Sequence, residues 1–549
     1  MKTTKLIICT LIILLQTQAM WSQKNEYNLV PKPQKLQTAS GQFIFNGETG
    51  LFLDKDVQPE AADAFFILAE RLKTAAGIEL QTLSAPRKNN VIVCKLNPKL
   101  PKKESYLLTI EKNQITVEAR EPVGFFYAAQ TIRQLLPPEI ESNAKQNGIQ
   151  WKSPCCRIED TPHYDYRGMH LDVCRHFSTK EEVMHYIDQL AFLKINTFHW
   201  HLTEDQGWRI EIKKYPLLTE IGGFRHRTVI GHARTKPRQW DNTTVGGFYT
   251  QEEIKEVIAY AQKRFINILP EIELPGHAVA ALAAYPQYSC SGGPFEVEGL
   301  FGIFNDVFCT REETFEFLEG VLDEVAALFP YEYIHIGGDE CPKLRWSRCH
   351  ACQERMKAEG LKDEHELQSY FISRIGKYLS TKGKKIVGWD EILEGGLTVK
   401  DATVMSWRGT EGGITAARMG HNVIMTPYTA LYLDYYQSKN TDGKLAIGSY
   451  LPLKTVYDYN PMPDVLTPAQ AKHIWGVQAN VWTEYMPNQK HREYMIFPRI
   501  LALAEIAWLP QSSKNYPDFK RRLTALLRHY DVMDINYFRD FDKEDCFIK

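Results

Sequence analysis

The amino-acid sequence predicts an α/β fold, a (β/α)8 TIM barrel preceded by a small α+β domain. The chain of 549 residues is too long for one small core and suits a large barrel with a smaller companion. After Tyr166, apolar strand-like segments alternate with long amphipathic helical segments, which is typical of parallel βαβ units. Each strand-like segment also ends in reactive or aromatic side chains, and a barrel collects its functional groups at that end of its strands.

The N-terminus has the pattern of a secretory signal peptide, which we place at residues 1–22. Two lysines precede an apolar run over residues 6–15, and the small residues Ala19 and Ser22 follow it. The run is too short to span a bilayer as a mature helix, and no later segment resembles a membrane span. We therefore expect an exported protein, either periplasmic or secreted.

Residues 23–155 predict the small α+β domain. Short alternating segments such as Tyr106–Ile110 and Gln114–Glu118 indicate half-buried strands. Two helical patterns accompany them, over residues 61–76 and 125–136, and a Pro-Pro pair ends the second helix.

Residues 156–549 predict the barrel, with helices at its C-terminal end. The expected strands are Tyr166–Val173, Asn196–Leu202, Ile266–Leu274, Tyr333–Gly338, Lys385–Trp389, Thr403–Trp407, His421–Thr426 and Gly476–Trp482. The helices expected between them include Thr179–Leu193, Glu252–Arg264, Arg311–Leu328 and Glu364–Thr381. A doubly wound open sheet would show the same alternation, and the polar residues at every strand end favour the barrel.

Composition narrows the class of partner. The formal net charge of −2 argues against nucleic acid, which favours a basic stripe on the protein. Apolar content of 44% and charged content of 24% are ordinary for a soluble globular protein. Aromatic residues make up 12% of the chain, and their flat faces suit sugar rings, although most of them are expected in the core.

The cysteines are expected in a compartment that permits disulfides. Cys290 and Cys309 bracket a Gly-rich loop and form the disulfide that we expect. The spacing of Cys349-His-Ala-Cys352, with Cys341 nearby, also fits half of a structural zinc site. Because no second CxxC pair is present in the sequence, a disulfide or free buried thiols are favoured over a metal.

The segment Ile334-His-Ile-Gly-Gly-Asp-Glu340 is the most informative motif. A β-prone run breaks at two glycines and delivers two adjacent acids, Asp339 and Glu340. Adjacent residues on an extended backbone point to opposite sides, so we expect one acid to donate a proton and the other to steer the substrate. A proton donor and a nucleophile about 5 Å apart fit neighbouring residues poorly. The alternative is a strand-end turn whose acids cap the next helix near Cys341.

Reactive and aromatic residue types follow all the predicted strands. Any one of them could be a satisfied structural polar group, but strand ends that all fall in phase are hard to obtain by chance. In strand order these residues are Asp172 and Arg175; His199, His201, Glu204 and Asp205; Glu271, Glu273 and His277; Asp339 and Glu340; Trp389, Asp390 and Glu391; Trp407 and Arg408; Tyr432 and Asp434; Trp482 and Glu484.

A series of long stretches resembles the family 20 glycoside hydrolases, the β-N-acetylhexosaminidases. In chain order they are YRGMHLDVCRHF, KINTFHWHLTEDQGWRIEI, LPEIELPGHA, IHIGGDE, GWDEIL, VMSWRG, LYLDYY and GVQANVWTE. The α+β domain before them resembles the usual N-terminal companion of that family. The resemblance implies an exo-acting, retaining hydrolase that removes terminal non-reducing β-linked GlcNAc or GalNAc from an oligosaccharide or glycoconjugate. It implies no cofactor and no metal, and it makes no prediction about oligomeric state.

The resemblance assigns the catalytic roles to the fourth strand end and to a relay behind it. Glu340 matches the general acid/base, which protonates the leaving oxygen and later deprotonates water. Asp339 would hold the acetamido N–H of the substrate while the acetamido oxygen attacks C1 and forms an oxazolinium ring, so the enzyme supplies no nucleophile. His277, together with Glu204 or Asp205, would tune the proton affinity of Glu340.

Two points about the relay stay open in the sequence. The family often has Asp where this chain has Glu204, so either Glu204 or Asp205 could meet His277. A histidine that merely anchors its loop is the alternative for His277.

The resemblance also implies a pocket for the acetamido group. Trp389, Trp407 and Trp482 would wall this pocket and stack under the sugar ring, and Tyr432 would hydrogen-bond the acetamido carbonyl. Each Trp alone is more often a core residue, but three at strand ends beside acids favour a ligand pocket.

The sugar hydroxyls would be fixed by Arg175, Asp434 and Glu484 through charge-assisted hydrogen bonds. Arg175 could instead form a structural ion pair with Asp172, which we expect behind the site. This many hydroxyl ligands imply a pocket closed at the non-reducing end and hence exo cleavage, and an acid at position 434 favours neutral sugars.

Three other functions are consistent with parts of the sequence. A metal-dependent hydrolase could use His199-x-His201, whose imidazoles share one face of a strand, with His277 and Asp339. A carbohydrate-binding protein on the scaffold of an inactive enzyme would lack the acid at 339 or 340, and both are present. A conventional glycosidase could use a different acid as nucleophile, either Glu391 or Glu484. The Arg- and His-rich loop from Gly222 to Gly247 lines the leaving-group side or is a solvated excursion.

Overall fold

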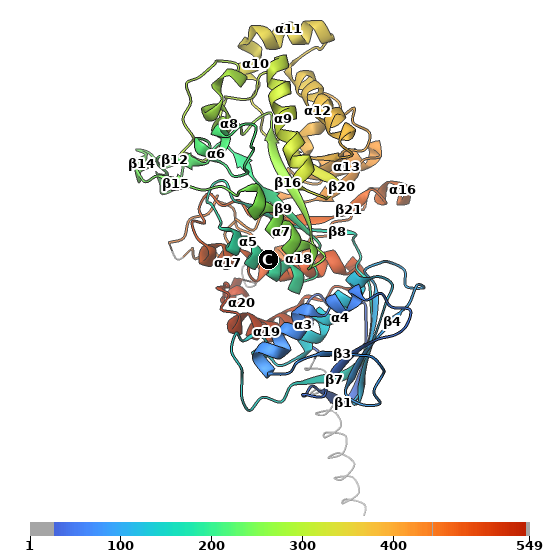
Figure 1. The fold of residues 1–549 in the computed structure, drawn as a ribbon. Coiled ribbons are helices and arrows are strands. Elements are labelled where there is room, and N and C mark those ends of the chain that lie inside the picture. Colours follow the sequence, from blue (N-terminus) through green and yellow to red (C-terminus); the bar gives the residue numbers. More distant parts are fainter. Residues whose placement is uncertain (1–26, 442, 545–549) are drawn as a thin grey trace, which may run out of the picture. The chain divides into compact units, whose positions relative to one another are not determined.

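A computed structural model describes residues 27–441 and 443–544, which form two compact units (Figure 1). Within the described residues, the first unit comprises residues 27–163, 192–194 and 504–535, and the second comprises the remainder. The predicted signal peptide, residues 1–22, lies outside the described residues.

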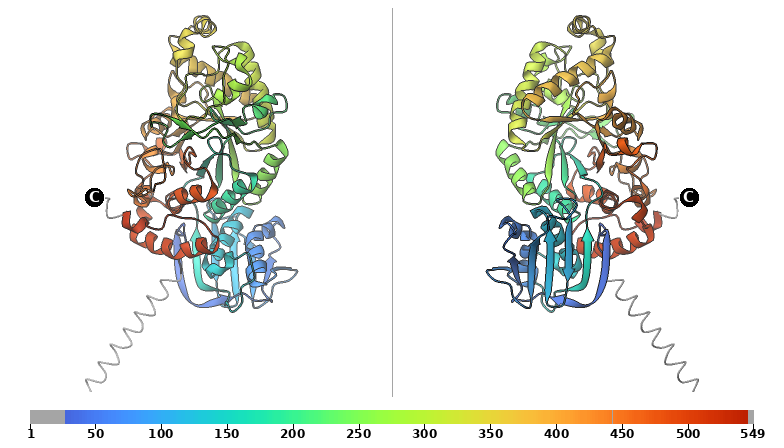
Figure 2. Two further views of the ribbon diagram at one scale, coloured as in Figure 1. Left: turned by 90° about the vertical axis from the view of Figure 1, so that its left-hand side faces the viewer. Right: turned by 90° about the vertical axis from the view of Figure 1, so that its right-hand side faces the viewer.

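The first unit is a mixed seven-stranded sheet with helices on one face (Figures 1 and 2). Its strand order is β1-β7-β5-β6-β4-β2-β3. Side chains along β5 alternate between buried and partly buried, as expected for a sheet covered by helices on one side. The strands are β1 (Lys35–Ile44), β2 (Gly50–Leu53), β3 (Gln81–Leu83), β4 (Val91–Leu96), β5 (Tyr106–Ile110), β6 (Gln114–Ala119) and β7 (Lys152–Asp160).

The predicted helices of this unit are present with shifted ends. The expected helix over residues 61–76 is divided into α2 (Glu60–Asp63), α3 (Phe66–Arg71) and a π-helical turn (Leu72–Ala76). The helix expected over residues 125–136 is α4 (Pro122–Leu135). The sequence-based domain boundary at residue 155 falls inside β7, which ends at Asp160.

The first unit also contains the C-terminal helix α19 (Tyr516–Val532). The buried Arg522 guanidinium lies 2.5 Å from a carboxylate oxygen of Glu505, and His529 Nδ1 lies 3.3 Å from Glu141 Oε1. The sequence predicted the C-terminal helices as part of the barrel domain, whereas α19 belongs to the same unit as the N-terminal sheet.

The second unit confirms the predicted barrel, because its eight parallel strands close in the order β16-β17-β18-β19-β20-β21-β8-β9. Each strand falls within a few residues of its predicted position. The strands are β8 (Tyr166–Asp172), β9 (Thr197–His201), β16 (Asn267–Leu274), β17 (Tyr333–Gly337), β18 (Lys385–Trp389), β19 (Thr403–Ser406), β20 (Asn422–Met425) and β21 (Ile474–Ala479).

Helices surround the barrel strands, and local signals fix their ends (Figure 1). The helix α7 (Gln251–Gln262) begins with a capping box, in which Thr250 accepts from the Glu253 N–H and Glu253 accepts from the Thr250 N–H. The Asp363 carboxylate caps α12 (Glu364–Thr381) by accepting from two backbone N–H groups. The other predicted helices are α5 (Lys180–Phe192) and α9 (Glu312–Leu328).

The interior of the barrel contains one buried acid surrounded by donors. Glu271 Oε2 lies 3.0 Å from His199 Nε2 and 2.5 Å from His201 Nδ1. Glu271 Oε1 lies 2.6 Å from His335 Nδ1 and accepts from Trp389 Nε1 at 2.9 Å. Burial alone would raise the pKa of Glu271, but the imidazoles outweigh it and hold the pKa well below 4.5. Both oxygens of Glu271 are therefore bound.

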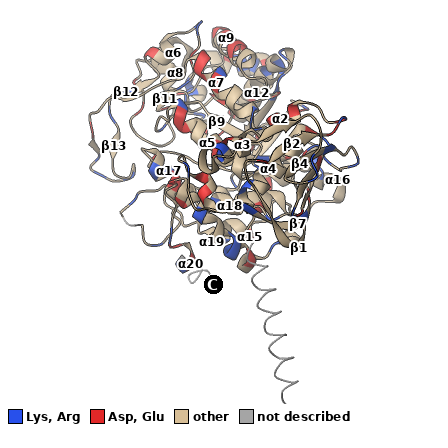
Figure 3. Ribbon diagram, turned by 60° about the horizontal axis from the view of Figure 1, so that its bottom comes forward, with Lys and Arg blue, Asp and Glu red and all other residues tan. Residues whose placement is uncertain are grey.

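In the view of Figure 3, the ribbon positions of acidic and basic residues are interspersed. Among the described residues, no helix combines the length and apolar character needed to cross a membrane.

The expected Cys290–Cys309 disulfide is wrong. Every cysteine among the described residues is a free thiol, and the sulfurs of Cys290 and Cys309 each lie 3.7 Å from the sulfur of Cys352. The chain brings these two residues to a third cysteine that is distant in the sequence, so loop proximity does not determine their partners.

Candidate active site

A cavity of about 420 Å³ lies at the carboxyl ends of the barrel strands. Its volume is in the range of small-molecule sites. The predicted site residues that line it are Arg175, His277, Asp339, Glu340, Trp389, Trp407, Tyr432, Trp482 and Glu484. The other predicted residues, Glu204, Asp205 and Asp434, do not line it and are buried.

The two adjacent acids reach the cavity because glycines turn the chain after β17. Gly337 and Gly338 have φ angles of 65° and 98°, in the region that favours glycine. A Cβ atom on Gly337 would lie 1.8 Å from Glu273 Oε2, so only glycine lets the chain pass this buried carboxyl. Glu340 itself has φ of 43°, an uncommon backbone conformation for a residue with a side chain. Such conformations cluster at functional sites.

His277 lies between the acids of the cavity and a buried pair of acids. Its Nδ1 lies 3.0 Å from Glu204 Oε1 and 3.0 Å from Asp205 Oδ2. Its Nε2 lies 3.5 Å from Glu340 Oε2 and 3.7 Å from Asp339 Oδ2. The sequence left open whether Glu204 or Asp205 contacts His277, and in the structure both do. The looser contacts on the cavity side can tighten when a ligand binds.

The charges around His277 are strongly coupled. Burial alone would lower the pKa of His277, but Glu204 and Asp205 outweigh it and raise the pKa well above 6.5. Burial alone would raise the pKa of Glu204, but Arg175 and His277 lower it to about 2. Burial and the charge of Glu204 raise the pKa of Asp205. At neutral pH the His277 side chain is therefore an imidazolium held by a carboxylate on its buried side.

Asp339 lines the cavity and keeps an unused hydrogen-bond acceptor. Its side chain is 13% exposed, and its Oδ1 has no hydrogen-bond partner among the described residues. Burial and the adjacent Glu340 raise the pKa of Asp339 to about 7, although His277 opposes them. Buried acceptors are nearly always satisfied in proteins, so this oxygen is suited to an N–H of a ligand.

Aromatic rings form one wall of the cavity. The rings of Trp407 and Tyr432 are stacked, with centroids 6.1 Å apart and an interplanar angle of 23°. The ring of Trp482 lies 5.9 Å from that of Trp389 and 6.4 Å from that of Tyr432. The indole N–H of Trp389 is bound to Glu271, and that of Trp407 donates to Glu391 Oε2 at 2.8 Å. These side chains are thus fixed before any ligand binds.

Arg175 forms the ion pair that the sequence offered as an alternative, and it also lines the cavity. Its guanidinium lies 2.5 Å from Glu204 Oε1 and 3.5 Å from Asp172 Oδ2, and it donates to Gln206 Oε1 at 2.9 Å. It also lines the cavity, 5.1 Å from the ring centroid of Trp482. A positive charge is therefore held rigidly at the edge of the cavity.

Asp434 and Glu484 place carboxyl groups near Arg175. Asp434 is 3% exposed, and neither of its carboxylate oxygens has a hydrogen-bond partner among the described residues. Burial and the charge of Glu484 raise the pKa of Asp434 well above 3.8. Burial likewise raises the pKa of Glu484 to about 7, although Arg175 opposes it. Both side chains are acceptors suited to hydroxyl groups.

The cavity also contains residues that the sequence did not single out. Arg234 lines it from the Arg- and His-rich loop, so part of this loop reaches the site. Tyr435 lines it as well, with its ring 5.9 Å from that of Tyr432. Residues 447–449 complete the lining from a segment with no pattern that could have identified them.

This arrangement removes the histidine pair of the metal-dependent alternative and one of the two candidate nucleophiles of the conventional glycosidase. The imidazoles of His199 and His201 both contact Glu271 in the barrel interior, where they are fully buried. Glu391, one candidate nucleophile, does not line the cavity, and burial with the charges of Asp339 and Asp390 raises its pKa to about 9. Glu391 is therefore a protonated partner of Trp407 at neutral pH.

The family description "Glycosyl hydrolase family 20, catalytic domain" matches residues 164–511 of this chain, and "Glycosyl hydrolase family 20, domain 2" matches residues 26–161. The chain is 45% identical over 541 residues to a beta-hexosaminidase of Porphyromonas gingivalis, covering 96% of this chain and 67% of that protein. It is 37% identical to a beta-hexosaminidase of Vibrio furnissii, covering 87% of this chain and 76% of that protein.

Solved structures give the same result. The exo beta-N-acetylglucosaminidase of Vibrio harveyi in complex with N-acetylglucosamine matches with a TM-score of 0.82 and 35% identity, covering 94% of this chain and 78% of that one. The beta-N-acetylhexosaminidase of Streptomyces coelicolor matches with a TM-score of 0.81 and 31% identity, covering 94% and 98%.

Proposed function

The chain belongs to glycosyl hydrolase family 20, and we propose that it hydrolyses its substrate with the substrate's own acetamido group as nucleophile. The enzyme is an exo-acting β-N-acetylhexosaminidase that removes terminal non-reducing N-acetylhexosamine from glycans. The proposal concerns the mechanism and the residues that perform it.

The observation that supports the mechanism most strongly is the environment of Asp339. This residue lines the cavity together with Glu340 and the aromatic rings, and its Oδ1 has no hydrogen-bond partner among the described residues. An acetamido group against that wall would donate its N–H to Asp339 Oδ1. The Tyr432 hydroxyl would donate to the acetamido carbonyl and so orient this oxygen toward C1. Negative charge on Asp339 then stabilises the oxazolinium ion as it forms.

Proton transfer is the role of Glu340. Its side chain is 34% exposed on the cavity, so it can reach the oxygen of a leaving group and afterwards a water molecule. It first gives its proton to the leaving oxygen, and it then takes a proton from the water that opens the oxazolinium ring. His277 holds a positive charge 3.5 Å from Glu340 and so favours the carboxylate that remains after the first step. Two inversions at C1 give net retention.

The hydroxyl groups of the terminal sugar would occupy the end of the site that carries Arg175, Asp434 and Glu484. The unpartnered oxygens of Asp434 support this assignment, because buried acceptors need donors and a sugar supplies O–H groups. Acidic side chains at positions 434 and 484 favour a neutral sugar over an anionic one. Recognition of several hydroxyls at once is consistent with exo cleavage.

We also propose that the enzyme acts outside the cytoplasm, in the periplasm or as a secreted protein. The support is the sequence of residues 1–22, which combines lysines, an apolar run and small residues. N-terminal sequencing of the protein recovered from its native host would test this proposal. A mature N-terminus near residue 23 is expected, and a retained Met1 would contradict it.

The mechanism is tested with p-nitrophenyl glycosides. Release of p-nitrophenol is expected from the β-linked N-acetylglucosaminide and N-acetylgalactosaminide and not from the β-glucoside, which has no acetamido group. Loss of the intramolecular nucleophile removes an advantage on the order of 10⁵ M in effective molarity. Comparable kcat values on the glucoside would contradict substrate assistance and would favour Glu484 as an enzyme nucleophile.

A further inference from the structure

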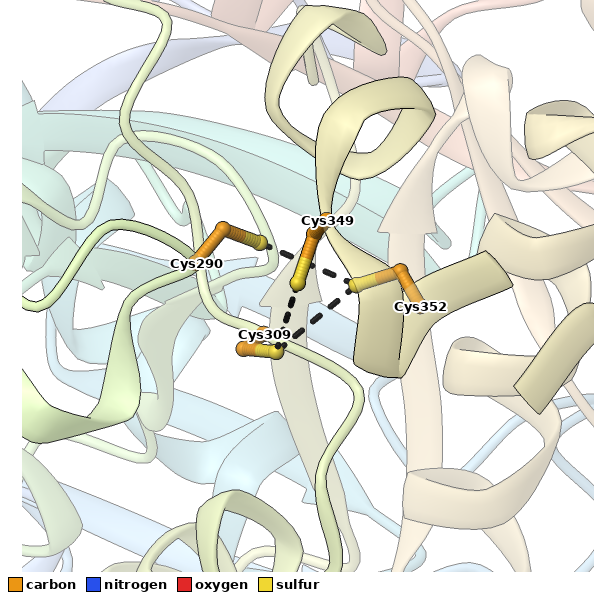
Figure 4. Close-up of side chains that lie close together, drawn as sticks. All are labelled: Cys290, Cys309, Cys349 and Cys352. Atoms are coloured by element: carbon orange, nitrogen blue, oxygen red, sulfur yellow. Dashed lines mark hydrogen bonds between the residues drawn. The ribbon is translucent and has the colours of Figure 1, made fainter. Parts of the chain in front are cut away.

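A second cluster of reactive side chains lies outside the cavity lining, where the sulfurs of Cys290, Cys309, Cys349 and Cys352 converge (Figure 4). Cys290 and Cys309 lie at the two ends of the segment that precedes α9. Cys349 precedes α11 (His350–Glu359), and Cys352 lies in its first turn. The two halves of the cluster are about 40 to 60 residues apart in the chain.

The distances between these sulfurs exclude disulfide bonds. Cys290 lies 3.7 Å from Cys352, Cys309 lies 3.7 Å from Cys352, and Cys309 lies 3.8 Å from Cys349. A disulfide bond measures about 2.05 Å between sulfurs. All the ligand atoms of the cluster lie within 4.8 Å of one another, so the sulfurs surround one point instead of forming two separate pairs.

The same distances fit a metal bound by four thiolates. Zinc binds cysteine sulfur at about 2.3 Å, and the corners of such a tetrahedron lie about 3.8 Å apart. The observed sulfur–sulfur distances are 3.7 and 3.8 Å. Cys309 and Cys352 are fully buried and Cys349 is 9% exposed, so these groups are enclosed by protein.

We propose that Cys290, Cys309, Cys349 and Cys352 form a structural zinc site. Four sulfur ligands in tetrahedral arrangement select zinc among the common divalent metals, because soft thiolates disfavour calcium and magnesium. A site with four protein ligands leaves no position for water or substrate, so the metal holds the fold and takes no part in hydrolysis. The sequence favoured thiols or a disulfide because it contains a single CxxC pair. In the structure, Cys290 and Cys309 supply the other two ligands.

The position of the site explains what zinc would hold together. The segment between Cys290 and Cys309 contacts the loops of the active site through its backbone, because the Glu298 N–H donates to the Asp205 carbonyl at 3.0 Å and the Phe308 N–H donates to the Pro275 carbonyl at 3.0 Å. On the other side, α10 (Leu344–Arg348) leads from the catalytic acids to Cys349, and the indole of Trp346 donates to the Phe308 carbonyl at 2.9 Å. Zinc would therefore fasten the loop after β16 to the helices after β17.

Metal analysis tests the proposal directly. Wild-type protein, purified without chelators or added metal, is expected to contain one zinc per chain by inductively coupled plasma mass spectrometry. The double variant C349A/C352A is expected to contain none. The matched control Cys94→Ala, which removes a buried thiol from the N-terminal sheet, is expected to keep the zinc. Wild-type protein without zinc would overturn the proposal.

Three measurements on the wild type remain decisive if the double variant does not fold. Alkylation of the denatured, unreduced protein is expected to modify all four cysteines, whereas peptides joined through Cys290–Cys352 or Cys309–Cys349 disulfides would overturn the proposal. Removal of the metal with a chelator is expected to lower Tm, and zinc alone is expected to restore it. Cobalt(II) added to the metal-free protein is expected to give the visible absorption of tetrahedral cobalt thiolate, and a spectrum of octahedral cobalt would overturn the site.

Discussion

Two groups of buried acids lie in the same barrel and differ in whether their carboxylate oxygens have hydrogen-bond partners. Glu271, in the interior, has both oxygens bound to imidazole or indole nitrogens at 2.5–3.0 Å. Asp339 and Asp434, at the carboxyl ends of the strands, keep acceptor oxygens with no hydrogen-bond partner among the described residues. Burial acts to raise the pKa of all three acids, but the imidazoles around Glu271 outweigh it and hold the pKa of Glu271 low, whereas the pKa values of Asp339 and Asp434 are raised.

We expect this difference to separate acids that hold the barrel from acids that bind a ligand. An acid with a full set of donors has nothing left to offer a substrate, whereas an unpartnered acid costs stability and is retained for what binds to it. Sequence position alone does not make this distinction, because Glu271 and Asp339 both lie at predicted strand ends. The predictions below change one acid at a time in each group.

The largest effect is expected for Glu340→Gln. The variant cannot donate the proton, so kcat for glycosides with poor leaving groups should fall by about 10²–10⁴-fold. Activated aryl glycosides, which depart without protonation, should lose much less. Steady-state kinetics on both substrate types measure this difference, and equal losses would mean that Glu340 is not the proton donor.

The second largest effect is expected for Glu271→Gln, which should lower the free energy of unfolding. The amide leaves buried imidazoles without their anionic partner, and breaking a buried charged pair costs about 3–5 kcal/mol. Denaturant unfolding should show this loss of free energy, with a clear fall in Tm. A variant that kept its stability and lost only kcat would place Glu271 among the catalytic acids and would break the comparison.

The third effect is expected at Asp339→Asn, which preserves shape and removes charge. Loss of one stabilising group at the developing positive charge should lower kcat by about 10²–10³-fold with little change in stability. Because burial and Glu340 raise the pKa of Asp339 to about 7, the group is neutral below that pH. The kcat/KM of the wild type should therefore fall as pH decreases through this range, and the residual activity of the variant should lack this limb. An unchanged kcat would remove Asp339 from the mechanism.

The smallest effect is expected for Asp434→Asn, which should raise the free energy of unfolding, whereas Glu271→Gln should lower it. Burial and Glu484 disfavour the ionised carboxyl, so the free protein should gain about 1 kcal/mol at neutral pH when the charge is removed. The same change should raise KM, because the amide is a weaker acceptor for sugar hydroxyls. Thermal unfolding and initial rates measure the two effects, and a destabilised variant with unchanged KM would place Asp434 with Glu271.

The sequence predicted the barrel and most of the cavity lining for a physical reason. Parallel strands are buried on both faces, so each is a short apolar run, and the residues after it must lie at one end of the barrel. This rule places Asp339, Trp389 and Glu484 together without any knowledge of contacts. It also explains why Arg234 was not singled out, since it lies in a long loop far from any strand end.

The contacts between side chains could not be predicted from the sequence. Cys290 was assigned to Cys309 by loop proximity, whereas the fold brings both to Cys352 in another segment. The bound state of Glu271 depends on two strands, β9 and β17, that supply His199, His201 and His335 to one point. Contacts of this kind depend on the closed barrel and leave no local pattern.

The most direct test of the central claim is to weaken the acetamido nucleophile in steps. Aryl glycosides that carry N-acetyl, N-fluoroacetyl, N-difluoroacetyl and N-trifluoroacetyl groups differ in the electron density of the attacking oxygen. If the substrate attacks its own C1, kcat/KM should fall steeply along this series while the aryl leaving group stays the same. A flat series would contradict the account, because an attacking group on the protein would not sense the fluorine atoms.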